Sequence, residues 1–348
     1  MPTKIEWTNE PWNPVTGCFV VSPGCTNCYA MRLAGTRLKH ETKRIGLTDI
    51  VNGKPVWNGK VRFNRSELDK PLRWRRPRRI FVCPHGDLFH EDVPKDWIDQ
   101  VMAVAALAPQ HTFQVLTKRG NRMYHYFLED AWGPVRDRVS DRADRYWDFD
   151  FNTLVGIDRF MEAHSRLAPR RGGWPLPNMH LGVSVENQEW ANKRIPYLLD
   201  TPAAIRWVSA EPLLGPVNLR EVWARMPSGG ESLYDTLGST RVDLRGDRRT
   251  LDWVVVGGES GPKARYMDPD WARSLRNQCA ETNVAYFFKQ WGEWAPSAHH
   301  YHDAELGKFQ GALYDYGFPR VVKVGKKRAG RTLDGVVHDA YPTELAAA

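Results

Sequence analysis

The chain has 348 residues, of which 42% are hydrophobic and 26% charged, and its formal net charge is +8. This is an ordinary globular composition, long enough for one large core or two modest ones. No apolar run approaches the roughly 18–20 residues that span a bilayer, and the N-terminus lacks the apolar stretch of a signal peptide. We therefore expect a cytoplasmic protein with no membrane partner, in which clustered cysteines serve a metal or catalysis rather than disulfides.

Three of the five cysteines lie close together near the N-terminus, at Cys18, Cys25 and Cys28. Thiolate sulfur is a soft metal ligand, and the Ser-Pro-Gly turn at residues 22–24 would fold the intervening loop back on itself. Three thiolates can hold three irons of a 4Fe–4S cluster and leave the fourth iron open to a substrate or cofactor. The spacing therefore predicts an iron–sulfur site with one vacant corner.

Zinc is the alternative metal for the same cysteines. A structural zinc site is closed and tetrahedral, so it needs a fourth ligand. The chain holds no second Cys-x2-Cys pair, so this ligand would have to be Cys83, Cys279 or a histidine.

Basic residues are concentrated further along, at residues 70–79, where six cations occur with no acid. Cations neutralise phosphates and an aromatic ring can stack on a base, so Arg73, Trp74, Arg75 and Arg76 are candidate nucleic-acid contacts. A solvated loop that leads into a strand explains the same run equally well. A second basic run lies at residues 323–331.

The rest of the chain alternates short apolar runs with helix-length segments. The runs are rich in β-branched and aromatic residues, as buried parallel strands are, and this alternation predicts an α/β fold with a parallel sheet, either a barrel or doubly wound. The expected strands are 79–83, 112–117, 180–185, 205–210, 251–256 and 284–288, and the expected helices are 95–107, 188–199 and 268–282. Two stretches, about 129–177 and about 221–249, interrupt this rhythm and are interpreted as insertions on one domain, either lids or substrate-recognition elements.

Polar or glycine-rich residues follow almost every expected strand. Because the carboxyl ends of parallel strands share one edge, where ligands bind, these residues predict a site at that edge. The candidates are Gly86, Asp87, Lys118, Arg119, Glu186, Glu211 and Lys289, together with Ser184 inside its strand.

The cysteine loop also resembles a known signature. Cys18, Cys25, Cys28 and Tyr29 look like the radical S-adenosylmethionine (SAM) motif, although six residues rather than the usual three separate the first two cysteines. The chain as a whole resembles a family of phage and prophage proteins that carry this motif and are grouped with radical SAM barrels. The matching segments are 6–8, 12–18, 86–90, 116–119, 182–186, 209–213, 257–260 and 289–292, with a weaker match at 330–335.

This resemblance implies a partial (β/α) TIM-like barrel of the radical SAM type, as a single domain over 1–348 with a C-terminal extension from about 295. It implies that Cys18, Cys25 and Cys28 ligate the cluster and that SAM chelates the open iron. One electron from a reductase then cleaves SAM to a 5′-deoxyadenosyl radical, which abstracts hydrogen from the substrate. Gly86 and Asp87 are expected near the SAM amino group.

Further roles follow from the same resemblance. Glu186 and Glu211 are expected to bind the ribose hydroxyls or act as acid or base, and Ser184 to line the SAM pocket. Lys118, Arg119 and Lys289 are candidate anchors for a substrate or SAM anion, and surface salt bridges are the alternative. Cys83 is a candidate hydrogen-atom donor, as thiols serve in the related spore photoproduct lyase, or else a buried small hydrophobe.

The predicted function is radical SAM chemistry on a nucleic-acid base or nucleotide, either as a modification or as lesion repair. A base inside a duplex would have to be flipped out to reach the cluster. Two alternatives stay open: a non-catalytic, zinc-containing nucleic-acid-binding protein, and a radical SAM enzyme that acts on a peptide or small metabolite.

Overall fold

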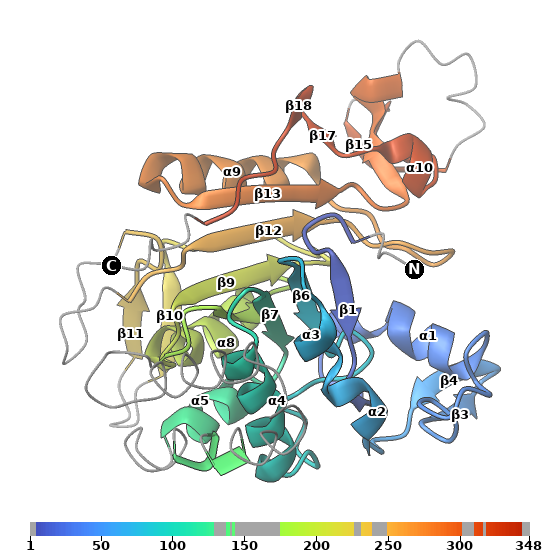
Figure 1. The fold of residues 1–348 in the computed structure, drawn as a ribbon. Helices are drawn as coiled ribbons and strands as arrows, with labels where there is room; N and C mark the ends of the chain where they lie inside the picture. The colour runs from blue at the N-terminus through green and yellow to red at the C-terminus, as the bar shows by residue number, and fades with distance from the viewer. Residues whose placement is uncertain are drawn as a thin grey trace.

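The structure is a computed structural model that describes residues 5–128, 137–139, 141–142, 175–225, 231–238, 249–300, 310–315 and 318–342. Its centre is a seven-stranded sheet in the order β1-β6-β7-β8-β9-β12-β13, with every neighbouring pair parallel. The sheet curls into a half-barrel (Figure 1). Its strands are β1 (Glu10–Trp12), β6 (Arg79–Val82), β7 (Thr112–Thr117), β8 (Met179–Ser184), β9 (Ile205–Ala210), β12 (Trp253–Gly257) and β13 (Ala285–Gln290).

Helices cover the convex face of this sheet. Parallel neighbours need crossover connections, and in the described part of the chain four of these each carry a helix of nine or more residues. Strand residues that point outward, such as Val82 and Val115, share one apolar core with helix residues such as Met102 and Ile195. The helices are α4 (Lys95–Leu107), α5 (Gly120–Leu128), α8 (Gln188–Asp200) and α9 (Pro269–Thr282).

Aromatic side chains fill the concave face. Because side chains alternate across a strand, Phe81 points inward between two outward neighbours and meets Trp7 at a ring separation of 4.7 Å. Trp207 and Trp253 lie 5.2 Å apart on adjacent strands. Gly182 leaves room for the Trp207 indole, since a Cβ at that glycine would come within 2.5 Å of the ring. This cluster forms the floor of the half-barrel.

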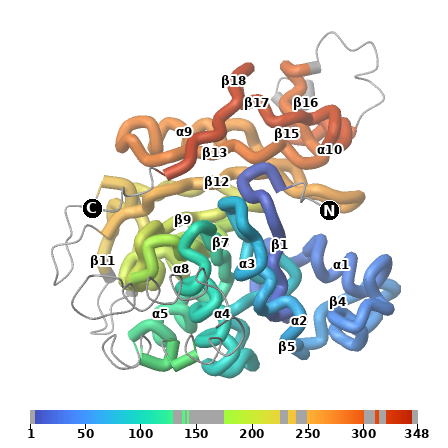
Figure 2. Tube along the Cα trace, in the orientation of Figure 1, coloured from blue at the N-terminus to red at the C-terminus, as the bar shows by residue number. Residues whose placement is uncertain are grey.

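Two smaller modules flank the sheet. In Figure 2 the C-terminal module and most of the N-terminal module lie at the edge toward which the strand arrows of Figure 1 point, whereas the last two helices of the N-terminal module lead back to the amino end of β6. The first comprises β2 (Val15–Thr16), η1 (Pro23–Cys25), α1 (Tyr29–Gly35), β3 (Thr48–Val51), β4 (Lys54–Trp57), β5 (Arg62–Phe63), α2 (Arg65–Leu68) and α3 (Lys70–Arg73). The second comprises β14 (Trp294–Pro296), η4 (Ser297–His300), β15 (Gly311–Asp315), β16 (Phe318–Lys323), α10 (Lys326–Ala329), β17 (Thr332–Leu333) and β18 (Val336–Val337).

The predicted parallel α/β sheet is confirmed. Its six predicted strands and three predicted helices are confirmed as well, and every predicted end lies within two residues of the observed one. The prediction missed β1 and α5. The first predicted insertion, 129–177, lies almost wholly outside the described residues, whereas the second contains the hairpin of β10 (Val222–Arg225) and β11 (Glu231–Tyr234). Among the described residues, no helix combines the length and the apolar character that a membrane crossing requires.

Candidate functional site

A cavity of about 540 Å³ lies at the carboxyl edge of the sheet, above the aromatic floor. Trp7 and Phe81 form part of its base, and the cysteine loop and the strand ends form its walls. Pockets of this size hold cofactors or small-molecule substrates. Its position is the one that parallel α/β folds use for ligands.

All three clustered cysteines line this cavity as free thiols. Cys25 ends the short helix η1, and Cys28 caps α1, where its Sγ accepts a hydrogen bond from the Met31 amide at 3.5 Å. Burial raises the pKa of Cys18 to about 12, and the nearby charges of Cys28 and Cys25 contribute in the same direction. Burial also raises the pKa of Cys28, so the Cys18 and Cys28 thiols stay protonated unless a cation replaces their protons.

Each of the three sulfurs has its own polar neighbour. The Nη1 atom of Arg119 donates to Cys18 Sγ at 3.5 Å, and the Ser22 hydroxyl lies 3.7 Å from Cys25 Sγ. The Met31 amide donates a hydrogen bond to Cys28 Sγ, as described above. Hydrogen bonds to ligating sulfurs are one means by which proteins orient cluster ligands and set cluster potentials.

Asp87 holds Arg119 in this position. Its Oδ2 accepts from Arg119 Nη1 at 3.0 Å and from the Lys118 amide at 3.1 Å, and its Oδ1 accepts from the Thr117 hydroxyl at 2.7 Å and the Phe89 amide at 3.0 Å. Asp87 was predicted to lie near the SAM amino group. It does line the cavity, but its two oxygens already accept four hydrogen bonds from the chain itself.

The Arg119 guanidinium is itself buried beneath the cavity wall. Its Nε pairs with Glu91 at 2.8 Å, and its charge lies 4.6 Å from the centre of the Phe19 ring. Burial acts to lower the pKa of Arg119, but Asp87, Cys18 and Glu91 together outweigh burial and raise it. Its buried Nη2 atom finds no hydrogen-bond partner among the described residues. Buried donors are usually paired in proteins, so this N–H group could donate a hydrogen bond to a bound ligand.

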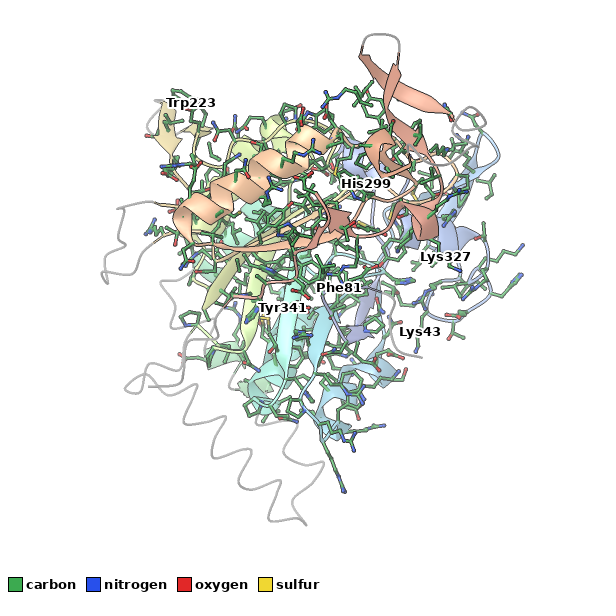
Figure 3. The ribbon with its side chains drawn as sticks, turned by 90° about the horizontal axis from the view of Figure 1, so that it is seen from above. Lys43, Phe81, Trp223, His299, Lys327 and Tyr341 are labelled. Carbon is green, nitrogen blue, oxygen red and sulfur yellow. The ribbon has the colours of Figure 1, made fainter. Side chains whose placement is uncertain are left out.

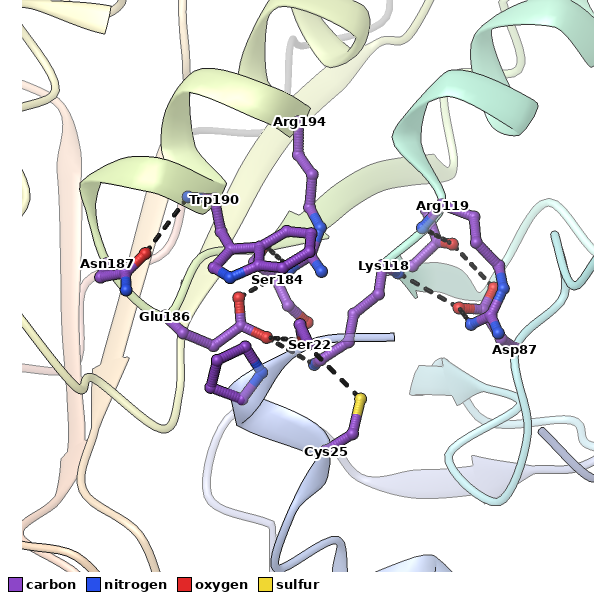
Figure 4. Close-up of polar contacts among 12 residues, drawn as sticks. Ser22, Cys25, Asp87, Lys118, Arg119, Ser184, Glu186, Asn187, Trp190 and Arg194 are labelled. Carbon is purple, nitrogen blue, oxygen red and sulfur yellow. Dashed lines mark hydrogen bonds and ion pairs between the residues drawn. The ribbon is translucent and has the colours of Figure 1, made fainter. Parts of the chain in front are cut away.

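Glu186 is not among the cavity-lining residues, although its strand ends there. The carboxylate is fully buried and ion-paired with Arg194 at 2.7 Å and with Lys118 at 3.7 Å, and it accepts from the Ser22 hydroxyl at 2.5 Å (Figure 4). Burial acts to raise the pKa of Glu186, yet Lys118 and Arg194 hold it below its ordinary value. Glu186 therefore ties the cysteine loop to α8, and its expected contact with ribose stays a prediction.

A group of polar side chains on the opposite wall comes from β8, β9 and β13. Ser184 and Ser209 are register partners on adjacent strands, and both line the cavity. Beyond them, Lys289 Nζ pairs with Glu211 Oε1 at 2.6 Å, with both side chains partly exposed. This wall offers two hydroxyls, one carboxylate and one ammonium to a ligand.

A separate network closes the end of β12 against the cysteine loop. Glu259 accepts from Asn27 at 2.9 Å and from Arg265 at 2.6 Å. Arg265 also donates to the Pro23 carbonyl at 2.9 Å. These contacts fix the loop from the side opposite Glu186.

Cys83 also reaches the cavity. It is buried and adopts a left-handed backbone conformation, with φ of +54°. Burial raises the pKa of its thiol to about 12, so the S–H bond is retained at neutral pH. The remaining cysteine, Cys279, lies on α9 in the outer core, on the other side of the sheet from the aromatic floor.

Most of the predicted site residues therefore lie around one cavity. Those that line it are Cys18, Cys25, Cys28, Cys83, Gly86, Asp87, Lys118, Arg119, Ser184, Glu211 and Lys289. Sequence reasoning missed Ser22, Asn27, Ser209, Glu259 and Lys326. Ser209 could have been found, because it occupies an inward position one strand from Ser184.

The basic run at residues 70–79 lies elsewhere. It precedes β6, so it lies at the amino end of that strand, whereas the cavity lies at the carboxyl ends. Arg73 is ion-paired with Asp69. Trp74 is half-buried, with Arg78 4.7 Å from its ring centre. The structure therefore does not place these predicted nucleic-acid contacts beside the cavity.

The chain matches one family model, described as a protein of unknown function (DUF5131), over residues 2–342. It therefore belongs to that family. No curated protein and no solved structure matches it.

Proposed function

We propose that this protein is a radical SAM enzyme that acts on a nucleic-acid base or nucleotide. The observation that carries the proposal is that Cys18, Cys25 and Cys28, all free thiols, line one cavity at the carboxyl edge of a parallel half-barrel. The resemblance of the cysteine loop to the radical SAM signature points the same way.

The residues present fit a 4Fe–4S cluster with three protein ligands. The donor set is three soft sulfurs, and each sulfur has a polar group within hydrogen-bond reach. Arg119, whose Nη1 donates to Cys18, also has an unsatisfied Nη2 that provides a donor for an inorganic sulfide or a ligating thiolate. When bound, the cluster and SAM supply one-electron cleavage of SAM and a 5′-deoxyadenosyl radical.

The chain's own residues would position the rest of the cofactor and the substrate. Ser184 and Ser209 present hydroxyls suited to ribose or to a carboxylate, and Glu211 presents a carboxylate held by Lys289. Asp87 acts on the site through Arg119, and Glu186 through the cysteine loop, so both are positioning residues. The aromatic floor excludes water from below.

Cys83 is the proposed hydrogen-atom donor to the substrate radical. A thiol can donate a hydrogen atom only while it keeps its proton, and burial at the cavity wall secures this. A Cys83→Ala variant should cleave SAM but form little product, and Cys279→Ala, on the far side of the sheet, should behave as wild type. Normal product formation by Cys83→Ala would show that Cys83 is not the hydrogen-atom donor.

A nucleic-acid substrate is supported by the net charge of +8 and by Lys326 in the cavity lining. The decisive experiment is anaerobic reconstitution followed by iron, sulfide and zinc analysis. We expect about four irons per chain, broad visible absorption, and release of 5′-deoxyadenosine from SAM in the presence of dithionite.

The control for this experiment is Cys18→Ala/Cys25→Ala/Cys28→Ala, which should lose iron and SAM cleavage together. Colourless protein with one zinc per chain would instead support the zinc-containing nucleic-acid-binding protein. Iron-loaded protein that cleaves SAM but binds neither oligonucleotides nor nucleotides would favour a peptide or small-metabolite substrate.

A further inference from the structure

The positive charge of the chain is distributed unevenly. Residues 29–65, here called the basic module, contain nine lysines and arginines but only two acids, in a chain whose net charge is +8. The module comprises α1, the β3–β4 hairpin and β5. Six of its cations are exposed and form no ion pair with any residue that the structure describes: Arg32, Arg37, Lys39, Lys54, Lys60 and Arg65.

The basic module borders the cavity. Tyr29 and Ala30 of α1 and Trp57 of β4 all belong to the cavity lining. Lys326, at the start of α10, lines the cavity too, and Lys327 and Arg328 extend this basic turn into solvent. Figures 1 and 3 place α10 and the basic module on the same side of the molecule, and Figure 3 labels Lys43 and Lys327 there. Cations therefore flank the cavity on two sides.

Two features of the basic module suit it to nucleic acid, which offers negatively charged phosphates and planar bases. Tyr29 is 43% exposed at the cavity, and its hydroxyl is held by the Pro84 carbonyl at 3.0 Å, so its ring is a fixed surface on which a base could stack. Lys54 contacts Lys263 of the loop after β12, and this contact between like charges lowers the pKa of Lys263. Phosphate groups would relieve the repulsion between such lysines.

We propose that the basic module and α10 together form a docking surface for single-stranded nucleic acid, which lays the sugar–phosphate backbone across the cavity opening. The cavity, at about 540 Å³, has room for a base and not for a duplex, so the strand must present an unstacked base. The chemical reaction of that base depends on the proposed radical SAM function. The binding itself is independent of the cluster.

The test compares two triple variants with the same change in charge. Arg37→Gln/Lys39→Gln/Lys54→Gln removes three cations of the basic module, and Arg73→Gln/Arg75→Gln/Arg76→Gln removes three from the basic run before β6. Fluorescence anisotropy with labelled DNA and RNA single strands of about 20 nucleotides gives the affinity at several salt concentrations. Thermal unfolding verifies that each variant is folded.

We expect the module variant to bind about tenfold more weakly or worse and to lose about 2 from the slope of log affinity against log salt, since each lost phosphate contact removes about 0.7. The variant of the 70–79 run should bind as wild type does. Equal or greater loss in that variant would overturn the proposal, as would the absence of binding by the wild type.

One further outcome assigns the surface to a different partner. If the module variant keeps its affinity for both strands but an acidic electron-carrier protein reduces its cluster more slowly, while dithionite reduces it normally, the surface serves the electron donor and the proposal is wrong. Oligonucleotide binding is measured on protein without its cluster. Failure of this proposal is therefore distinct from failure of the radical SAM assignment, which metal analysis and SAM cleavage decide.

Discussion

The guanidinium of Arg119 bridges Asp87 and Cys18: its Nη1 atom lies 3.0 Å from Asp87 Oδ2 and 3.5 Å from Cys18 Sγ. A buried carboxylate thus orients a cation against a candidate cluster ligand. Charge-assisted hydrogen bonds are stronger than neutral ones, and a positive group beside a ligating sulfur favours the reduced, more negative cluster. If Cys18 ligates the proposed cluster, Arg119 is therefore placed to influence its reduction potential.

The first prediction concerns this cation. Arg119→Lys keeps the charge beside Asp87 but loses the planar fork that reaches Asp87, Glu91 and Cys18 together. We expect a cluster that assembles but has a more negative reduction potential, measured by titration monitored by electron paramagnetic resonance. Arg122→Lys, a neighbour that donates to the Val93 carbonyl, is the control. An unchanged potential in Arg119→Lys would contradict a tuning role.

The second prediction concerns Glu186. Replacement by Gln leaves Arg194 and Lys118 without their buried counter-charge, and breaking such a pair costs about 3–5 kcal/mol of unfolding free energy. Urea denaturation at neutral pH should show this loss. Glu189→Gln, which removes an exposed partner of Lys193 one turn away on α8, should cost less than about 1 kcal/mol. Similar values for the two variants would mean that the buried network contributes little.

The third prediction is a pH dependence that arises from His85. Burial, together with the charge of Arg44, lowers the pKa of His85 from 6.5 to about 4, and its Nδ1 accepts from Arg44 Nε at 3.2 Å. Between these pH values the unfolded chain binds a proton that the folded chain does not. Stability should therefore fall as the pH drops from about 6.5 to about 4, by up to about 1.4 kcal/mol per pH unit for this group.

The measurement is urea denaturation at a series of pH values across that window. His180, which burial alone also shifts to a pKa of about 4, contributes with the same sign. His85→Gln should therefore flatten the profile without abolishing the dependence. A variant profile as steep as that of the wild type would show that His85 is protonated in the folded protein at these pH values.

The sheet could be predicted from the sequence because its strands are buried on both faces. Continuous apolar runs such as residues 253–257 are distinctive, and the proline that precedes α4 and the one just beyond its end mark that helix clearly. The strand β1 was missed because it has only three residues and includes Pro11. Its pairing with β6 depends on the tertiary structure rather than on a local pattern.

The position of the site could be predicted from the sequence, but the roles of its residues could be predicted only in part. Parallel topology brings strand ends together, so Glu211 and Lys289 could be placed at one edge in advance. Which carboxylates remain available to a ligand depends on distant partners. Glu186 is engaged by Ser22 and Arg194, and Asp87 by Arg119, and no local spacing indicates either pairing. The position of the basic run at residues 70–79 relative to the cavity was not predictable either, because charge density along the sequence does not specify which end of a strand carries the charge.

The last prediction concerns Gly24, at the tight contact between the cysteine loop and Glu186. A Cβ at this position would collide with Glu186 Oε1 and come within 2.5 Å of its Cγ. The Glu186 side chain is held by Arg194, Lys118 and Ser22, so the loop rather than the carboxylate has to move. Gly24→Ala should therefore displace the neighbouring Cys25, lower the iron bound per chain after anaerobic reconstitution, and cost about 1–3 kcal/mol of unfolding free energy.

Gly238→Ala is the matched control, since the nearest atom to its added Cβ is the Asp235 carboxylate at 3.3 Å, far from the cavity. A double-mutant cycle tests the cause directly. Glu186→Ala removes the atoms that the new Cβ would meet, so adding Gly24→Ala to it should cost much less stability than adding it to the wild type. If the two substitutions are instead additive, Gly24 does not owe its identity to the contact with Glu186, and the anchoring of the cysteine loop must lie in the contacts of Asn27 and Arg265.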